Sequence, residues 1–265
     1  MKKKRGCGYR LFQLFFLLLL LLCVGVYFLV VFPFWGYPFH SNKDLKAPLT
    51  PAWALEPWLW EDDGNTSETI LSLLREYEAQ DFPVRTILID SPWSMRYNDF
   101  AIDEKRYPKP AEFFGDLDKR GYRVVLWMTP MVNSESKEGK IAIADSREWY
   151  EKARGDGYLA GGGSQVGWWM GRGGFIDYTN PAAMKWWRGM QSQVFEWGLD
   201  GWKLDDTATQ FGFIYRGLNF PLPVPYLNAN TGPMTTRQYM DHYYRDEYRH
   251  GLTKNPEFVT MSRST

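Results

Sequence analysis

Polar residues that could do chemistry stand at the ends of short apolar runs at five separate points of the chain. These runs are rich in β-branched and aromatic residues and therefore predict strands, and the residues in question are Asp90, Thr129, Asp177, Asp205 and Arg263. A carboxylate held at a strand end can act as a nucleophile or as a general acid or base. The alternative is that such an acid lies in a loop and is solvated. Which of the two roles applies depends on the strands and helices that position these residues.

The predicted elements alternate between strands and helices. Strands are expected within 52–60, 84–90, 123–130, 175–178, 201–205 and 257–263, and helices within 65–80, 110–122, 181–197 and 235–251. This alternation predicts an α/β fold built from parallel βα units. A (β/α)8 TIM-type barrel gathers its strand ends into an active site. A doubly wound sheet is the alternative, but no Gly-rich phosphate turn follows the first strand.

Residues at the helix ends support these assignments. Asn65 is expected to cap the first of these helices, with Glu68 as its capping-box partner. Pro110 begins the second, and Asn180 caps the third. A Gly-rich region with Trp168 and Trp169 precedes the third helix and is expected to wall a cleft.

The N-terminal residues predict a membrane anchor. Residues 11–37 are uncharged and long enough to cross a hydrocarbon core. Basic residues at 2–5 and at Arg10 favour a cytoplasmic N-terminus, which places the rest of this single-pass protein outside the cytoplasm. A cleaved signal peptide is the alternative. The predicted order is a basic cytoplasmic segment (1–10), a transmembrane helix (11–37), a linker (38–51) and a barrel domain (52–265).

Composition excludes several kinds of partner. The chain carries 31 basic and 31 acidic residues, well mixed along its length, so nucleic acid is not expected to bind. The three histidines, His40, His242 and His250, are scattered, and neither a metal site nor a cofactor is predicted. Both cysteines lie in or beside the apolar segment, so the exported part has no disulfide. Nothing in the sequence indicates the oligomeric state.

Five segments resemble glycoside hydrolase family 31, the retaining α-glycosidases, in the order that this family shows. They read LIDSPWSMRYNDFAIDEKRYPKP, GYRVVLWMTPMV, GGFIDYTNPAAMKWW, LDGWKLDD and FVTMSRS. The resemblance covers roughly residues 52–265 and implies a catalytic barrel that acts on carbohydrate. An α-galactosidase-type barrel is a weaker alternative, because the RYPKP phrase is not expected there.

The resemblance also implies roles for single residues. Asp205 matches the nucleophile, Asp90 the acid that binds sugar hydroxyls, and Arg263 an arginine that reaches the same sugar; Trp127, Asp177, Trp168 and Lys203 would line the pocket. Such a nucleophile forms a glycosyl ester, which water hydrolyses with the help of a second carboxyl. Asp206, next to the nucleophile, is expected to be solvated or to support its neighbour.

The sequence departs from the family pattern at both ends. The β-sandwich that family members carry before the barrel and the later segment with the acid/base aspartate are not recognised, so an incomplete barrel of about five or six strands is expected. Two functions follow. One is a membrane-anchored retaining α-glycosidase, a hydrolase or a transglycosylase, and the other is a non-catalytic glycosidase-like protein that binds carbohydrate or a partner protein.

Overall fold

The protein is described by a computed structural model that covers residues 7–32, 49–62, 64–137, 142–205, 214–215, 218–219 and 226–262. The chain divides into two compact units, 1–46 and 47–265. In the first unit, helix α1 (Cys7–Val26) continues into the π-helix η1 (Tyr27–Val31). A 22-residue span from Gly8 to Leu29, of mean hydropathy 2.6, is long and apolar enough to cross a membrane. A signal sequence would have the same properties.

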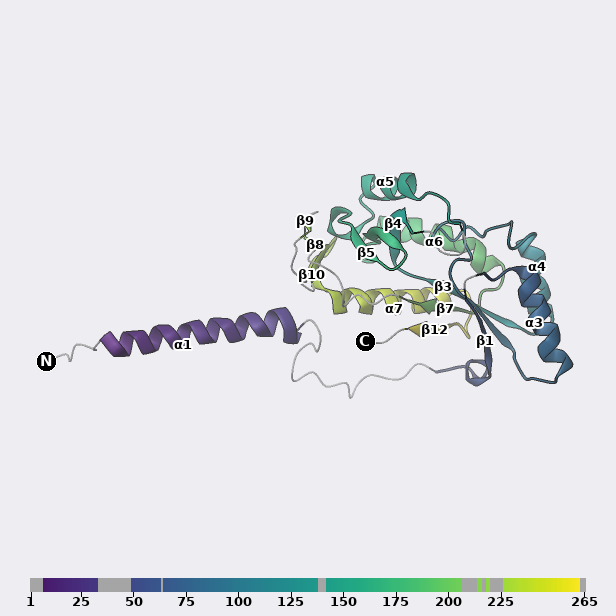
Figure 1. Cartoon of the computed structure of the whole chain (residues 1–265), viewed down its shortest axis with the longest axis horizontal. Coiled ribbons are helices and arrows are strands. Elements are labelled where there is room, and N and C mark those ends of the chain that lie inside the picture. Colours follow the sequence, from purple (N-terminus) through teal and green to yellow (C-terminus); the bar gives the residue numbers. More distant parts are fainter. Residues whose placement is uncertain are drawn as a thin grey trace. The chain divides into compact units, whose positions relative to one another are not determined.

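A five-stranded parallel sheet forms the centre of the second unit (Figure 1). Its strands, in spatial order, are β1 (Trp58–Glu61), β2 (Thr86–Ile89), β3 (Arg123–Met128), β7 (Gly201–Leu204) and β12 (Val259–Ser262). The spatial order is also the chain order. A doubly wound sheet reverses its order at a switch point, and this sheet does not. The winding is therefore that of a barrel, of which the sheet supplies five strands of the usual eight.

Four helices connect the neighbouring strands of this sheet. They are α3 (Ser67–Ala79), α4 (Pro110–Lys119), α6 (Pro181–Glu196) and α7 (Thr236–Leu252). Figure 1 shows α7 alongside β7 and β12, and it contacts both of these strands. The predicted Asn180 cap is confirmed, since its side-chain oxygen accepts the backbone N–H groups of Ala182 and Ala183.

Two local predictions at the start of this unit are wrong. The expected strand 52–60 is a 3-10 helix, η2 (Ala52–Leu55), followed by the shorter strand β1. The cap of α3 is Thr66, which forms a reciprocal capping box with Thr69. Asn65 cannot serve, because its buried amide bonds the Asp62 carbonyl and the Tyr107 hydroxyl.

Two insertions interrupt the alternation of strands and helices. Between β3 and α6 lie β4 (Met131–Ser136), α5 (Arg147–Gly155), the 3-10 helix η3 (Ala160–Gly162), β5 (Val166–Trp168) and β6 (Gly171–Phe175). Strands β4, β6 and β5 form a separate antiparallel sheet. The predicted strand 175–178 is therefore not part of the parallel sheet, since only Phe175 is a strand residue and it ends β6.

The second insertion, between β7 and α7, contributes another small sheet. Its strands are β8 (Ile214–Tyr215), β9 (Leu218–Asn219), β10 (Tyr226–Ala229) and β11 (Gly232–Thr235). Strands β10 and β11 form an antiparallel pair that leads directly into α7.

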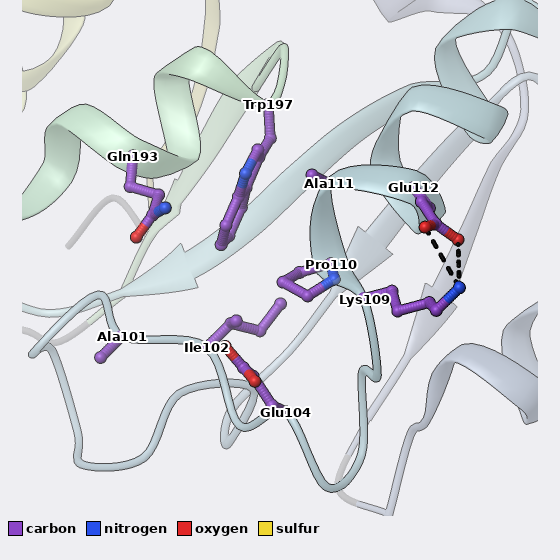
Figure 2. A pocket seen from close by; sticks show the side chains of 9 residues that line it. All are labelled: Ala101, Ile102, Glu104, Lys109, Pro110, Ala111, Glu112, Gln193 and Trp197. Atoms are coloured by element: carbon purple, nitrogen blue, oxygen red, sulfur yellow. Dashed lines mark hydrogen bonds and ion pairs between the residues drawn. The ribbon is translucent and has the colours of Figure 1, made fainter.

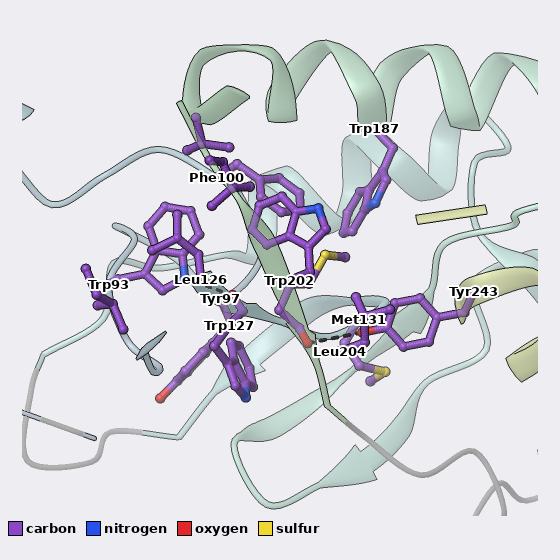
Figure 3. Close-up of a cluster of buried hydrophobic side chains, with 14 of the residues drawn as sticks. Trp93, Tyr97, Phe100, Leu126, Trp127, Met131, Trp187, Trp202, Leu204 and Tyr243 are labelled. Carbon is purple, nitrogen blue, oxygen red and sulfur yellow. Dashed lines mark hydrogen bonds between the residues drawn. The ribbon is translucent and has the colours of Figure 1, made fainter. Parts of the chain in front are cut away.

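The parallel sheet buries apolar residues on both faces, as expected for a barrel wall. One face belongs to the main core, where Phe100, Trp187 and Trp202 pack edge to face with centroids 4.9 and 5.6 Å from the Phe100 ring (Figure 3). On the other face, Leu88 and Val125 form a small cluster with Trp53 of η2. The alternation of side chains along each strand therefore separates a helix-covered face from an inward face.

Candidate active site

A cleft of about 330 Å³ lies where the parallel strands end. Its lining comes from β1, β3 and β7, from residues that follow β1, β2 and β7, and from the β5–β6 turn: Trp60, Asp62, Asp90, Ser91, Trp127, Trp169, Met170, Lys203 and Asp205. Four predicted site residues, Asp90, Trp127, Lys203 and Asp205, are thus brought together. Parallel strands cause this, because their carboxyl ends share one edge.

Asp90 follows β2 and is buried. Its Oδ1 accepts the Ser91 backbone N–H at 2.7 Å, and its Oδ2 accepts the Trp60 indole N–H at 2.7 Å and the Lys203 ammonium. Burial raises the pKa of Asp90 above its ordinary value, and the bond from Lys203 offsets part of that rise. The carboxyl is therefore held in one orientation by three donors.

Lys203 links the two buried acids of the cleft. It lies on β7 with its side chain 11% exposed, and its ammonium forms an ion pair with Asp90. The same ammonium lies 3.8 Å from Asp205 Oδ2 and 4.6 Å from the centre of the Trp60 ring. The resemblance implied that Lys203 lines the pocket, and the structure pairs it with Asp90 as the closer of the two acids.

Asp205 follows β7 directly and is buried at the edge of the cleft. Its backbone N–H bonds the Met128 carbonyl at the end of β3, which fixes its main chain to the sheet. The Trp127 indole N–H donates to Asp205 Oδ2 at 3.0 Å. Backbone and side chain are both anchored, so this carboxylate has the fixed position that a nucleophile needs.

Aromatic rings form the wall behind Asp205. The Trp168 ring lies nearly parallel to Trp127, with centroids 6.2 Å apart and planes at 13°, and its indole N–H donates to Asn133. Trp169 lines the cleft with its side chain 45% exposed. Both tryptophans were expected at the cleft. Trp168 stacks on Trp127 without lining the cleft itself, while Trp169 lines the cleft and exposes its ring to a ligand.

In the part of the chain that the structure describes, the other predicted residues do not line this cleft. The Asp177 carboxylate accepts hydrogen bonds from the Thr179 backbone and hydroxyl and from the Asn230 backbone N–H, which ties two turns together. Thr129 is held by Asn98. Arg263 and Asp206 lie outside the described residues.

Trp60 and Asp62 line the cleft, although sequence reasoning assigned neither a role. The pattern that could have found them is the period of two along β1, because alternate residues of a strand point to the same face. Trp60 and Asp62 lie on the same face of this strand and its extension as Trp58, which packs against Trp53 of the inward cluster.

The described residues contain no group of three or more His, Cys, Asp or Glu side chains that could hold a metal ion. A second hollow, of about 380 Å³, lies between the start of α4, the loop at 101–104 and the end of α6 (Figure 2). Its ion pair, Lys109 with Glu112, has both side chains more than 70% exposed. No strand-end acid lines it, so the cleft at the strand ends is the better candidate.

Comparisons with known proteins agree with this geometry. Residues 47–265 match the model of the glycosyl hydrolases family 31 TIM-barrel domain. An α-xylosidase of Emericella nidulans is 30% identical over 60% of this chain and 20% of its own length. The myogenesis-regulating glycosidase of Mus musculus is 28% identical over 57% of this chain and 20% of its own length. The chain thus spans about a fifth of these curated relatives.

Among solved structures, a dextranase of Flavobacterium johnsoniae in complex with glucose aligns with a TM-score of 0.67. The alignment covers 82% of this chain and 26% of the dextranase, at 18% sequence identity. At this identity the likeness shows the fold, a parallel sheet of the TIM-barrel kind. Together with the family model, which matches well over half of the sequence, it identifies the chain as a member of glycoside hydrolase family 31.

Proposed function

We propose that this chain forms the sugar-binding and nucleophile-bearing part of a retaining α-glycosidase, with Asp205 as the nucleophile. Asp90, Lys203 and Trp127 are its sugar-contacting or supporting residues, and Arg263 is a further sugar-binding residue. The observation that carries this proposal is the convergence of Asp90, Lys203 and Asp205 on one cleft at the strand ends. Family membership supports the reaction class.

The chemistry follows from the geometry of the carboxylates. Asp205, oriented by the Trp127 N–H, would attack the anomeric carbon of the bound sugar and form a glycosyl ester. A second carboxyl, about 5 to 5.5 Å from the nucleophile, would protonate the leaving oxygen and later activate water. Asp90 is assigned a different role, because its three donors, from Ser91, Trp60 and Lys203, favour the ionised carboxylate. Its role is to accept sugar hydroxyls.

The proposed substrate is an O-linked α-glycoside. The cleft pairs buried carboxylates, which accept hydrogen bonds from sugar hydroxyls, with the exposed Trp169 face, which can pack on a sugar ring. The relatives include α-xylosidases and a 1,3-α-isomaltosidase, and their names support α-linked substrates for this chain as well.

The N-terminal segment is proposed to anchor this enzyme in a membrane. Support comes from the apolar helix between Gly8 and Leu29 and from the basic residues that precede it. The barrel domain would then lie outside the cytoplasm. If so, alkaline carbonate should leave the full chain in the membrane pellet, and protease added to sealed cells or vesicles of known orientation should reach the barrel domain only from the extracytoplasmic side. Release by carbonate would contradict the anchor.

The experiment that tests the activity is a panel of aryl α-glycosides, with the matching β-glycosides as controls. The full chain should release the phenol from at least one α-glycoside, and proton NMR should show the α-anomer of the sugar as the first product. Asp205→Ala should abolish the release. No turnover above that of this variant, or a β-anomer as first product, would contradict the proposal.

A further inference from the structure

Trp60 makes two contacts at the cleft that converge on the same ion pair. Its indole N–H donates to Asp90 Oδ2 at 2.7 Å, and its ring lies under the Lys203 ammonium at 4.6 Å. The ammonium itself donates to the same Asp90 oxygen. Trp60 therefore contacts both members of the ion pair, one through its edge and one through its face.

These contacts bear on whether the Lys203 ammonium forms its ion pair with Asp90 or with Asp205. The Lys203 ammonium lies 3.8 Å from Asp205 Oδ2, which is beyond a hydrogen bond but within reach of a side-chain rotation. A shift of about 1 Å toward Asp205 would make a direct ion pair there, since such bonds are about 2.7–2.9 Å long. That pair would neutralise part of the charge with which a nucleophile attacks. The π face of Trp60 opposes this shift, because it attracts the cation toward β1.

The same contacts leave Asp90 with a defined capacity for a ligand. A carboxylate has about four lone-pair sites. Among the described residues, Ser91 occupies one site on Oδ1, while Trp60 and Lys203 occupy both on Oδ2. One acceptor site on Oδ1 is left for a hydroxyl group. Loss of the Trp60 donor would reopen Oδ2 and loosen the selection of that hydroxyl.

We propose that Trp60 is a positioning residue of this site: its N–H and its ring face together hold the Lys203 ammonium on Asp90 and away from Asp205. This inference rests on the proposed function for its catalytic consequence. The interactions of Trp60 with Asp90 and Lys203 are given by the contacts alone and do not depend on the proposed function.

The test compares two tryptophans of the same strand. Trp60→Phe removes only the N–H donor, and Trp60→Leu removes the donor and the aromatic face. Trp58→Phe is the matched control, because the Trp58 indole N–H lies on the same face of β1 but is buried without a hydrogen-bond partner among the described residues. Circular dichroism of all variants checks folding, and Trp60→Phe keeps the test valid if Trp60→Leu is unstable.

The first readout is the rate at which a 5-fluoro-α-glycosyl fluoride labels the protein, measured at saturating and at sub-saturating probe. Loss of one charge-assisted hydrogen bond should slow labelling at saturation about five-fold in Trp60→Phe. Loss of the cation–π contact as well should bring the decrease to about thirty-fold in Trp60→Leu. Trp58→Phe should label as the unmodified chain does.

The second readout needs no activity. Carbon-13 NMR of the full chain with labelled aspartate, assigned with Asp90→Asn, follows the Asp90 carboxyl as it titrates beside Asp62, Lys203 and Asp205. Trp60→Phe should raise the Asp90 pKa, since the lost donor favoured the ionised form, whereas Trp58→Phe should leave it unchanged. If the unmodified chain is not labelled, the proposed function fails, and this titration still decides the role of Trp60. Equal Asp90 titrations in Trp60→Phe and Trp58→Phe would overturn the inference.

Discussion

Replacement of Lys203 by methionine should destabilise the protein far more than the loss of an ordinary ion pair. The Lys203 and Asp90 side chains are only 11% and 6% exposed, so the substitution leaves a buried carboxylate without its cation. Breaking such a buried pair costs about 3–5 kcal/mol in the free energy of unfolding. We expect about 3 kcal/mol, because the pair borders a cleft that water reaches and two other donors to Asp90 remain. Guanidinium chloride unfolding at pH 7 measures this loss.

The loss should depend on pH in a definite direction. Burial already raises the pKa of Asp90, and without Lys203, whose hydrogen bond and charge lower it, the pKa rises further. A carboxyl whose pKa is higher in the folded state destabilises the fold above its unfolded pKa and has no effect well below it. The difference between Lys203→Met and the unmodified chain should therefore be largest at neutral pH and shrink as the pH falls toward 4.

Two variants control this experiment. Lys152→Met breaks an ion pair with Asp156 in which the side chains are 62% and 39% exposed, and it should change the free energy of unfolding far less than Lys203→Met does. Asp90→Asn added to Lys203→Met removes the unpaired charge and should recover much of the stability. If Lys203→Met is no more destabilising than Lys152→Met at pH 7, the ion pair of the cleft does not hold Asp90 as described.

Two further predictions concern groups away from the cleft. Glu247 is fully buried and accepts hydrogen bonds from Tyr178, Trp187, Gln191 and Arg188. Glu247→Ala should therefore cost about 3–5 kcal/mol in the free energy of unfolding, measured with urea. Glu247→Gln keeps the shape of the side chain and should cost less, so equal losses would contradict this expectation by showing that the charge alone carries the contribution. Burial, assisted by the charge of Arg188, lowers the pKa of His250 to about 4. The unfolded chain therefore takes up a proton first, and stability should fall as the pH drops from about 6.5 to about 4. His250→Phe should flatten the dependence of Tm on pH in this range, and an unchanged dependence would contradict the role of His250.

The sequence predicts the strand ends of this fold well because the signals are local. Asp90 and Asp205 follow short apolar runs, and helix caps or glycines separate the runs, so the placement of both acids at one sheet edge requires only that the strands be parallel. The cap of α3 was misassigned by one residue because Asn65 and Thr66 are both good caps, and only the distant Tyr107 determines which amide is occupied.

Strand partners are what the sequence leaves undetermined. The run that ends at Asp177 resembles the run that ends at Asp205, yet its strand pairs antiparallel with β4 and β5, so Asp177 serves two turns instead of the cleft. A short apolar run carries no information about its partner. Trp60 was missed for the same reason, because its role depends on a hydrogen bond to Asp90, which lies thirty residues away in the sequence.

The central claim is that Asp205 is the nucleophile, and covalent labelling tests it most directly. A 5-fluoro-α-glycosyl fluoride suits the purpose, because fluoride leaves with little help from a general acid. The full chain should gain the mass of one glycosyl group, and peptide mapping should place it on Asp205. Asp205→Asn should remain unlabelled, while Asp116→Asn, which removes an exposed carboxyl on α4, should label normally. A glycosyl group on any other residue, or undiminished labelling of Asp205→Asn, would contradict the account.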